Sequence, residues 1–102
     1  MDEAKIIVRA ATPKDDAVIA EAVAMAIGDE EALHNYCGSD YIAVLRSIAR
    51  REATQYSWRG ALVAEVNSVA AGAIVGYDGA QLYALREGTF AVITECIGRI
   101  PT

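Results

Sequence analysis

The chain has 102 residues, a net charge of −5 and a pI near 4.7, and hydrophobic residues make up 54% of it. This length suits one domain, and so high an apolar fraction excludes an intrinsically disordered chain. The acidic balance argues against nonspecific nucleic-acid binding, because the chain repels phosphates, and no apolar stretch approaches the ~18–20 residues that span a bilayer.

The N-terminal residues and the two cysteines indicate the compartment. Acidic residues stand where a secretory signal would be basic, and no apolar segment of the kind found in such signals follows them. Cys37 and Cys96 are too few for a disulfide scaffold. We therefore expect a cytoplasmic protein with no membrane partner and no nucleic-acid partner.

The first predicted elements are a strand over residues 6–11 and a helix that begins at Thr12. The strand is a short β-branched run that we expect to be buried on at least one face. Thr12 is a favourable N-cap, because Pro13 then takes the first helical position and Asp15 follows three residues after the cap. Apolar residues recur at every fourth position of this helix, which Gly28 ends.

Residues 29–38 are polar, acidic and irregular, and we predict that they are mostly loop. A second helix follows, capped by Ser39 or Asp40. Its apolar residues follow the i, i+3, i+4, i+7, i+8 pattern of an amphipathic helix: Tyr41, Val44, Leu45, Ile48 and Ala49.

The segment after Gly60 has the strongest strand character in the chain. Residues 61–66 and 69–77 predict an antiparallel hairpin with a turn at Asn67 and Ser68. Gly72 and Gly76 leave part of one face of the second strand bare, so another backbone or a ligand can approach there.

Two short helices are predicted at the end of the chain. Residues 80–87 form the first, Gly88 interrupts it, and Thr89 caps a last helix that Gly98 stops. The element order is therefore β–α–α–β–β–α. It predicts a single α+β domain over residues 1–102, with a three-stranded antiparallel sheet covered by helices.

Several motifs in this order resemble one family. Residues 7–16, IVRAATPKDD, are similar to the I-R-x-A-x-P-x-D opening of the GNAT superfamily of N-acetyltransferases. Residues 61–74, ALVAEVNSVAAGAI, resemble the second and third strands of that superfamily. Residues 52–57 with their Gln-Tyr-Ser end, and residues 76–82, GYDGAQL, are similar to a group of bacterial GNAT proteins.

The resemblance implies the N-terminal, acceptor-side half of the GNAT acyltransferase fold. The implied reaction transfers an acetyl group from acetyl-CoA to a small-molecule or peptide amine. The family's Q/R-x-x-G-x-G/A turn, which holds the cofactor's pyrophosphate at a helix N-terminus, has no match in this sequence. We therefore expect a truncated domain that is inactive alone, and we assign it no catalytic and no cofactor-binding residue.

Substrate-binding candidates follow from the same resemblance. Tyr77 and Asp78, in the Gly-Tyr-Asp-Gly run, are the first candidates for contact with the acceptor, and the polar-tipped Tyr56 is another. Glu30 and Glu31 follow the first helix, where the family's acceptor site lies, and would attract a cationic amine. The alternatives are a solvated acidic loop and tyrosines that anchor the edge of the core.

Other residue patterns give weaker indications of chemistry. His34 and Cys37 have the spacing of two zinc ligands, but no suitable further ligands are evident, and we expect no metal. As a nucleophilic pair they lack a third, orienting group. Arg46, Arg50 and Arg51 would suit a phosphate, or would form the solvated face of an amphipathic helix.

A second function, from a different class, is a dimerisation or protein-interaction module. The third predicted strand, residues 69–77, lacks the neighbour that the family would supply. An apolar, unpaired strand edge of this length invites pairing with another chain. We therefore expect a homodimer formed through this exposed edge.

Overall fold

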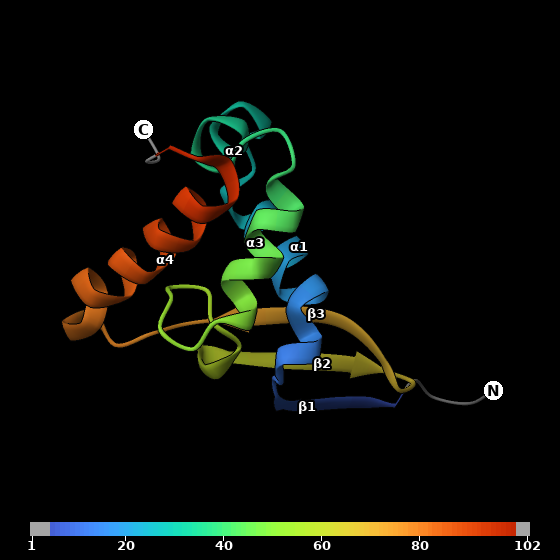
Figure 1. Ribbon diagram of the computed structural model, residues 1–102. Helices are drawn as coiled ribbons and strands as arrows, with labels where there is room; N and C mark the ends of the chain where they lie inside the picture. The colour runs from blue at the N-terminus through green and yellow to red at the C-terminus, as the bar shows by residue number, and fades with distance from the viewer. Residues whose placement is uncertain (1–4, 100–102) are drawn as a thin grey trace.

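The computed structural model describes residues 5–99, in which three antiparallel strands lie beneath four helices (Figure 1). The sheet has the order β1-β2-β3. The elements are β1 (Ile6–Ala10), α1 (Asp16–Ile27), α2 (Glu30–Cys37), α3 (Tyr41–Arg50), β2 (Ala61–Val66), β3 (Val69–Val75) and α4 (Leu82–Ile97). The predicted α+β class with its three-stranded antiparallel sheet is confirmed. No helix within residues 5–99 is both long and apolar enough to cross a membrane.

Strand β1 is an edge strand that pairs only with β2, with Val8 opposite Ala64. Ile6 and Val8 face the side of the sheet that carries no helix, and they are 68% and 65% exposed. The prediction that this strand is buried on one face is wrong. The reason is that α1 packs against β3, at the opposite edge of the sheet, and leaves β1 uncovered.

The predicted cap at the start of the first helix is confirmed. Thr12 Oγ1 accepts a hydrogen bond from the Lys14 amide, and the Asp15 carboxylate accepts one from the Thr12 amide at 2.8 Å. Residues Pro13–Asp15 form a 3-10 turn that leads into α1. The Arg9 guanidinium donates to both oxygens of Asp15, at 2.8 and 2.9 Å, and also to Glu65. These bonds tie β1, β2 and the start of α1 together.

Asp16, the first residue of α1, joins that helix to α3. The residue is only 6% exposed, and its carboxylate accepts hydrogen bonds from Arg46 at 2.8 Å and Arg50 at 2.6 Å. Arg51 pairs with Glu95 on α4. The three arginines are exposed, as the solvated-face alternative had it, and each of them also binds a carboxylate.

Most of residues 29–38 form a helix, α2 (Glu30–Cys37), so the prediction of mostly loop is wrong. Asp29 Oδ1 accepts hydrogen bonds from the amides of Glu31 and Ala32, which starts α2. Leu33 and Cys37, four residues apart, are buried on one side of the helix. Burial of these two residues decides the structure of a segment whose polar composition alone indicated a loop.

The C-terminal segment is one continuous helix, and the predicted break at Gly88 and cap at Thr89 are wrong. Gly88 lies against the backbone of the loop that follows α3, where a Cβ would stand 1.9 Å from the carbonyl oxygen of Ala53. Thr89 is fully buried; it donates to the Leu85 carbonyl and accepts from the Gln55 amide. The two residues that looked like a helix boundary therefore dock α4 onto that loop.

The β2–β3 hairpin is confirmed, with positive φ at both turn residues, Asn67 and Ser68. A β-bulge shifts its register: Ala64 is opposite Gly72, whereas Glu65 is opposite Ala70. Strand β3 ends at Val75, two residues earlier than predicted. As a result, Tyr77 lies beyond the strand and is free to turn toward the helices.

Replacing Gly88 by alanine tests the docking of α4. The added methyl group would meet the Ala53 carbonyl, so the backbones must separate, and we expect unfolding to become easier by about 2 kcal/mol. Gly79→Ala is the matched control, because a Cβ there meets no atom within 4 Å. Urea unfolding monitored by circular dichroism compares the two variants; equal stability of both would contradict the docking contact.

Candidate functional site

Three tyrosines from different parts of the chain gather between the helices. Tyr36 and Tyr56 line a cavity of about 480 Å³ together with Ile27, Ala32 and Asn35, and we call this cavity the tyrosine pocket. Tyr77 lies next to it, because its hydroxyl is 3.2 Å from Nε2 of Gln55, the residue preceding Tyr56. The pocket thus joins α1, α2 and the loop after α3.

The loop that carries Gln55 and Tyr56 is hydrogen-bonded to two helices, α3 and α4. Thr54 Oγ1 donates to the carbonyl of Ile48 on α3 at 2.8 Å. The Gln55 amide donates to Thr89 Oγ1 on α4 at 3.0 Å. The position of Tyr56 between the two helices therefore depends on buried hydrogen bonds rather than on the composition of the loop.

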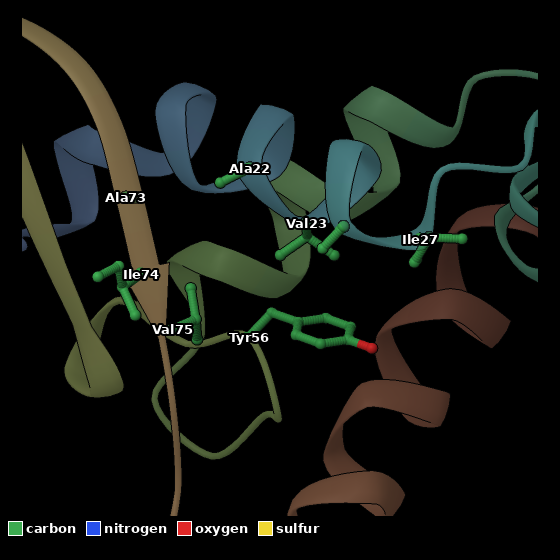
Figure 2. Close-up of a pocket in the computed structure, with 8 residues that line it drawn as sticks. Ala22, Val23, Ile27, Tyr56, Ala73, Ile74 and Val75 are labelled. Atoms are coloured by element: carbon green, nitrogen blue, oxygen red, sulfur yellow. The ribbon is translucent and has the colours of Figure 1, made fainter.

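A second cavity of about 400 Å³ adjoins the first at Ile27 and Tyr56, and we call it the edge cavity. Figure 2 shows it between α1 and the end of β3, with the Tyr56 ring below α1 and the hydroxyl directed toward α4. Apart from that hydroxyl, the lining side chains are aliphatic: Ala22, Val23, Ala26, Ile27, Ala73, Ile74 and Val75. The two cavities together offer an apolar compartment and a tyrosine-lined one.

Burial changes the protonation of the tyrosines. It raises the pKa of Tyr36 to about 12, with smaller contributions from Tyr56 and other neighbours, and it also raises the pKa of Tyr56. Both hydroxyls are therefore protonated near neutral pH. They can donate and accept hydrogen bonds there, but they do not act as general bases.

Gln55 is a buried polar residue beside the pocket. It is 9% exposed, and its Oε1 has no hydrogen-bond partner within the described part of the chain. A buried carbonyl oxygen without a partner costs free energy, so this atom is an acceptor with a hydrogen bond still to make.

The structure brings two of the predicted site residues together and places the other three elsewhere. Tyr56 and Tyr77 come together around Gln55. Glu30 and Glu31 are exposed in the first turn of α2 and line neither cavity. Asp78 Oδ1 accepts from the Ala80 amide and caps the 3-10 turn Gly79–Gln81.

Three residues of the site escaped the sequence reasoning: Asn35, Tyr36 and Gln55. Asn35 and Tyr36 belong to the segment predicted as loop, so nothing indicated that they share a helix with buried residues. Gln55 stood in the Gln-Tyr-Ser motif, which was the one signal available for it.

His34 and Cys37 do not form a reactive pair. Burial raises the pKa of the Cys37 thiol to about 11, which keeps it protonated and inert. His34 is about half exposed and contacts Glu30 at 3.7 Å. Residues 5–99 contain no group of three or more His, Cys, Asp or Glu side chains that could hold a metal ion.

Five arginines and the N-terminus of α2 are poorly suited to the pyrophosphate of acetyl-CoA. Five arginines are bound to carboxylates: Arg9, Arg46, Arg50, Arg51 and Arg59. The N-terminus of α2 is capped by Asp29 and flanked by two glutamates, so it repels an anion. No step involving the cofactor is therefore derived from these residues.

Titration of the tyrosines tests the burial of Tyr36. The pKa of about 12 predicts that Tyr36 ionises late in a titration of the five tyrosines, and that the late part of the tyrosinate absorbance, to which Tyr56 also contributes, decreases in Tyr36→Phe. Because the folded pKa exceeds the unfolded value of 10.0, this group's contribution to stability is complete below pH 10 and is lost as pH rises toward 12. Loss of an early component instead would show that Tyr36 is solvent-exposed.

No protein-family model and no curated protein sequence matches the chain. Two solved structures are similar to it. One, described as an acetyltransferase, has a TM-score of 0.73 and 23% identity, covering 87% of this chain and 48% of that one. An N-acetyltransferase from Staphylococcus aureus Mu50 has a TM-score of 0.61 and 28% identity, and the match covers 72% of this chain and 41% of that one. The chain thus has a GNAT-like N-acetyltransferase fold and spans about half the length of the acetyltransferases it matches.

Proposed function

We propose that this chain is the acceptor-binding half of an N-acetyltransferase, which transfers an acetyl group from acetyl-CoA to a primary amine with an apolar or aromatic body. The observation that carries the proposal is the tyrosine pocket next to the aliphatic edge cavity, with Ile27 and Tyr56 lining both, within a fold shared with solved acetyltransferases.

The chemistry of the cavities supports an amine of this kind. An ammonium group is attracted to the faces of aromatic rings, and Tyr36 and Tyr56 supply such rings. The net charge of −5, with Glu30 and Glu31 in the first turn of the helix that carries Tyr36, favours the approach of a cation. No basic side chain lines either cavity, so a carboxylate on the acceptor would find no cationic partner in the lining.

The donor side of the reaction belongs to other residues in this proposal. Acetyl-CoA is the donor that the fold implies, and five of the arginines that could meet its phosphates are bound to carboxylates. Polypeptide beyond residues 5–99 would bind the donor and polarise its carbonyl, so we expect the 102-residue chain to be inactive alone. Cys37 and Cys96 are free thiols, which fits the cytoplasm as the compartment.

Binding of a simple aromatic amine tests the acceptor site. Phenethylamine, titrated into the isotope-labelled chain, is expected to shift the amide resonances around Tyr36 and Tyr56 with a Kd of about 1 mM. Tyr56→Leu should weaken this binding about fivefold, since it removes a ring from the site. Tyr83→Leu is the matched control, because Tyr83 is 77% exposed and lines neither cavity.

The carboxylate analogue 3-phenylpropanoate gives the second control. It has the same ring and nearly the same length, and the absence of a basic lining residue predicts that it does not bind. Equal binding of the amine and the acid, or shifts confined to other parts of the chain, would contradict the proposed acceptor class.

A dimerisation module is the second candidate function. The observation that favours it is the outer edge of β3, which no other strand among residues 5–99 covers. This function needs neither a donor site nor an acceptor, so a measurement of the oligomeric state is sufficient to test it.

A further inference from the structure

The two cysteines of the chain lie where the ends of α2 and α4 meet (Figure 1). Cys37 is the last residue of α2, and Cys96 is the last but one of α4. The residues that follow them are in contact, because a Cβ on Gly38 would stand 3.1 Å from Cγ2 of Ile97. The two thiols therefore flank a contact between helices that are far apart in the sequence.

Both cysteines also line one cavity, of about 350 Å³, which α3 borders through Ala43, Val44 and Ser47. Cys37 is fully buried and Cys96 is exposed. Burial raises the pKa of Cys37, and the nearby Cys96 raises it further, so the two thiols are close to each other. The cavity leaves room for a rotamer change at Cys96, which has a single side-chain torsion.

The position of the two cysteines in their helices makes a bond between them accessible. Both lie in the last turn of a helix, where the backbone opens at little cost in free energy. A disulfide requires the two Cβ atoms to approach to about 3.5–4.5 Å. The rotamer freedom at Cys96 and the give of the helix ends supply this approach.

We propose that Cys37 and Cys96 form a reversible intramolecular disulfide that fastens the end of α2 to the end of α4. The oxidant is a low-molecular-weight disulfide such as glutathione disulfide. The Cys96 thiolate attacks one of its sulfurs, which releases one glutathione and leaves a mixed disulfide on Cys96. The Cys37 thiolate then attacks the Cys96 sulfur and releases the second glutathione. Two electrons and two protons thus pass from the protein thiols to glutathione.

Exposure decides which thiol reacts first. Cys37 is buried, and its pKa of about 11 keeps it from reacting with an oxidant in solution, so the first step belongs to the exposed Cys96. The second step takes place within one molecule, and the high effective concentration of the mixed disulfide offsets the small fraction of Cys37 thiolate. In a reducing compartment such a bond is transient and senses the redox state.

The bond would act chiefly on α2. Leu33 and Cys37 are the buried residues of this helix, and the Tyr36 ring meets Phe90 of α4 edge-on, with the ring centroids 6.2 Å apart. Asn35 and Tyr36, which line the tyrosine pocket, directly precede Cys37. The disulfide would therefore order one wall of that pocket. This consequence rests on the proposed function, whereas formation of the disulfide does not.

Mass spectrometry of the 102-residue chain tests the disulfide. The dilute chain is incubated with glutathione disulfide, and the remaining thiols are then blocked with iodoacetamide. The product should be lighter than the reduced chain by two hydrogen atoms, carry neither glutathione nor an alkyl group, and return to the dithiol with dithiothreitol. A product that keeps glutathione on Cys96, or a covalent dimer of two chains, would overturn the proposal.

Three variants assign the two steps. Cys37→Ala should stop at the mixed disulfide on Cys96, and Cys96→Ser should form neither adduct nor disulfide, since its one thiol is buried. Cys96→Ser combined with Ala91→Cys is the matched control, because residue 91 is exposed on the same helix but does not line the cavity. It should take up glutathione and stop there. An internal disulfide in this control, at the wild-type yield, would show that the position of Cys96 is irrelevant. Circular dichroism verifies that each variant is folded.

Thermal unfolding and amide hydrogen exchange test the link between the helices. The disulfide closes a loop of about 60 residues, which should raise the Tm of the oxidised chain by about 10 °C. Exchange of the α2 amides should slow about tenfold. Cys37→Ala treated in the same way should show neither change. A disulfide that forms but leaves both quantities unchanged would contradict the fastening of α2. No amine is used here, so failure of the acceptor-binding test leaves these results unaffected.

Discussion

The packing of α4 against the loop after α3 positions the candidate site. Gly88 allows the two backbones to approach, and the buried Thr89 hydroxyl accepts from the Gln55 amide while donating within its own helix. This contact fixes the positions of Gln55 and Tyr56. Without it, the loop would have no fixed relation to α2, and Tyr36 and Tyr56 would not share a cavity.

The rest of the scaffold is held by ion pairs that connect successive elements. Arg9 ties β1 to the start of α1, and Asp16 ties α1 to α3 through Arg46 and Arg50. Burial opposes ionisation of Asp16, but its hydrogen bonds with the two arginines outweigh this effect, and its pKa lies below the usual value. The same pairs have a functional consequence, because arginines bound to carboxylates are not available for the phosphates of a nucleotide donor.

Local signals predicted the parts of the fold that depend on neighbouring residues. Thr12 and Asp15 form their reciprocal cap within four residues, and Asn67 and Ser68 turn the hairpin without help from distant groups. The sequence could not indicate α2, which depends on burial of Leu33 and Cys37 against other helices. It also could not indicate that Gly88 serves a backbone contact with Ala53, since that contact joins residues far apart in the chain. Tyr56 and Tyr77 were predicted for the site through resemblance, whereas Tyr36 depends on α2 and was missed.

The central claim is that this chain provides an acceptor site without a donor site. Isothermal titration of acetyl-CoA into the 102-residue chain tests it most directly, after light scattering has established the oligomeric state. The account predicts no detectable heat at about 1 mM acetyl-CoA from a folded protein, because the family's pyrophosphate-binding turn has no match in the sequence and five arginines are already bound to carboxylates. Binding in the micromolar range would contradict it and would show that the chain, alone or as a dimer, holds the donor as well.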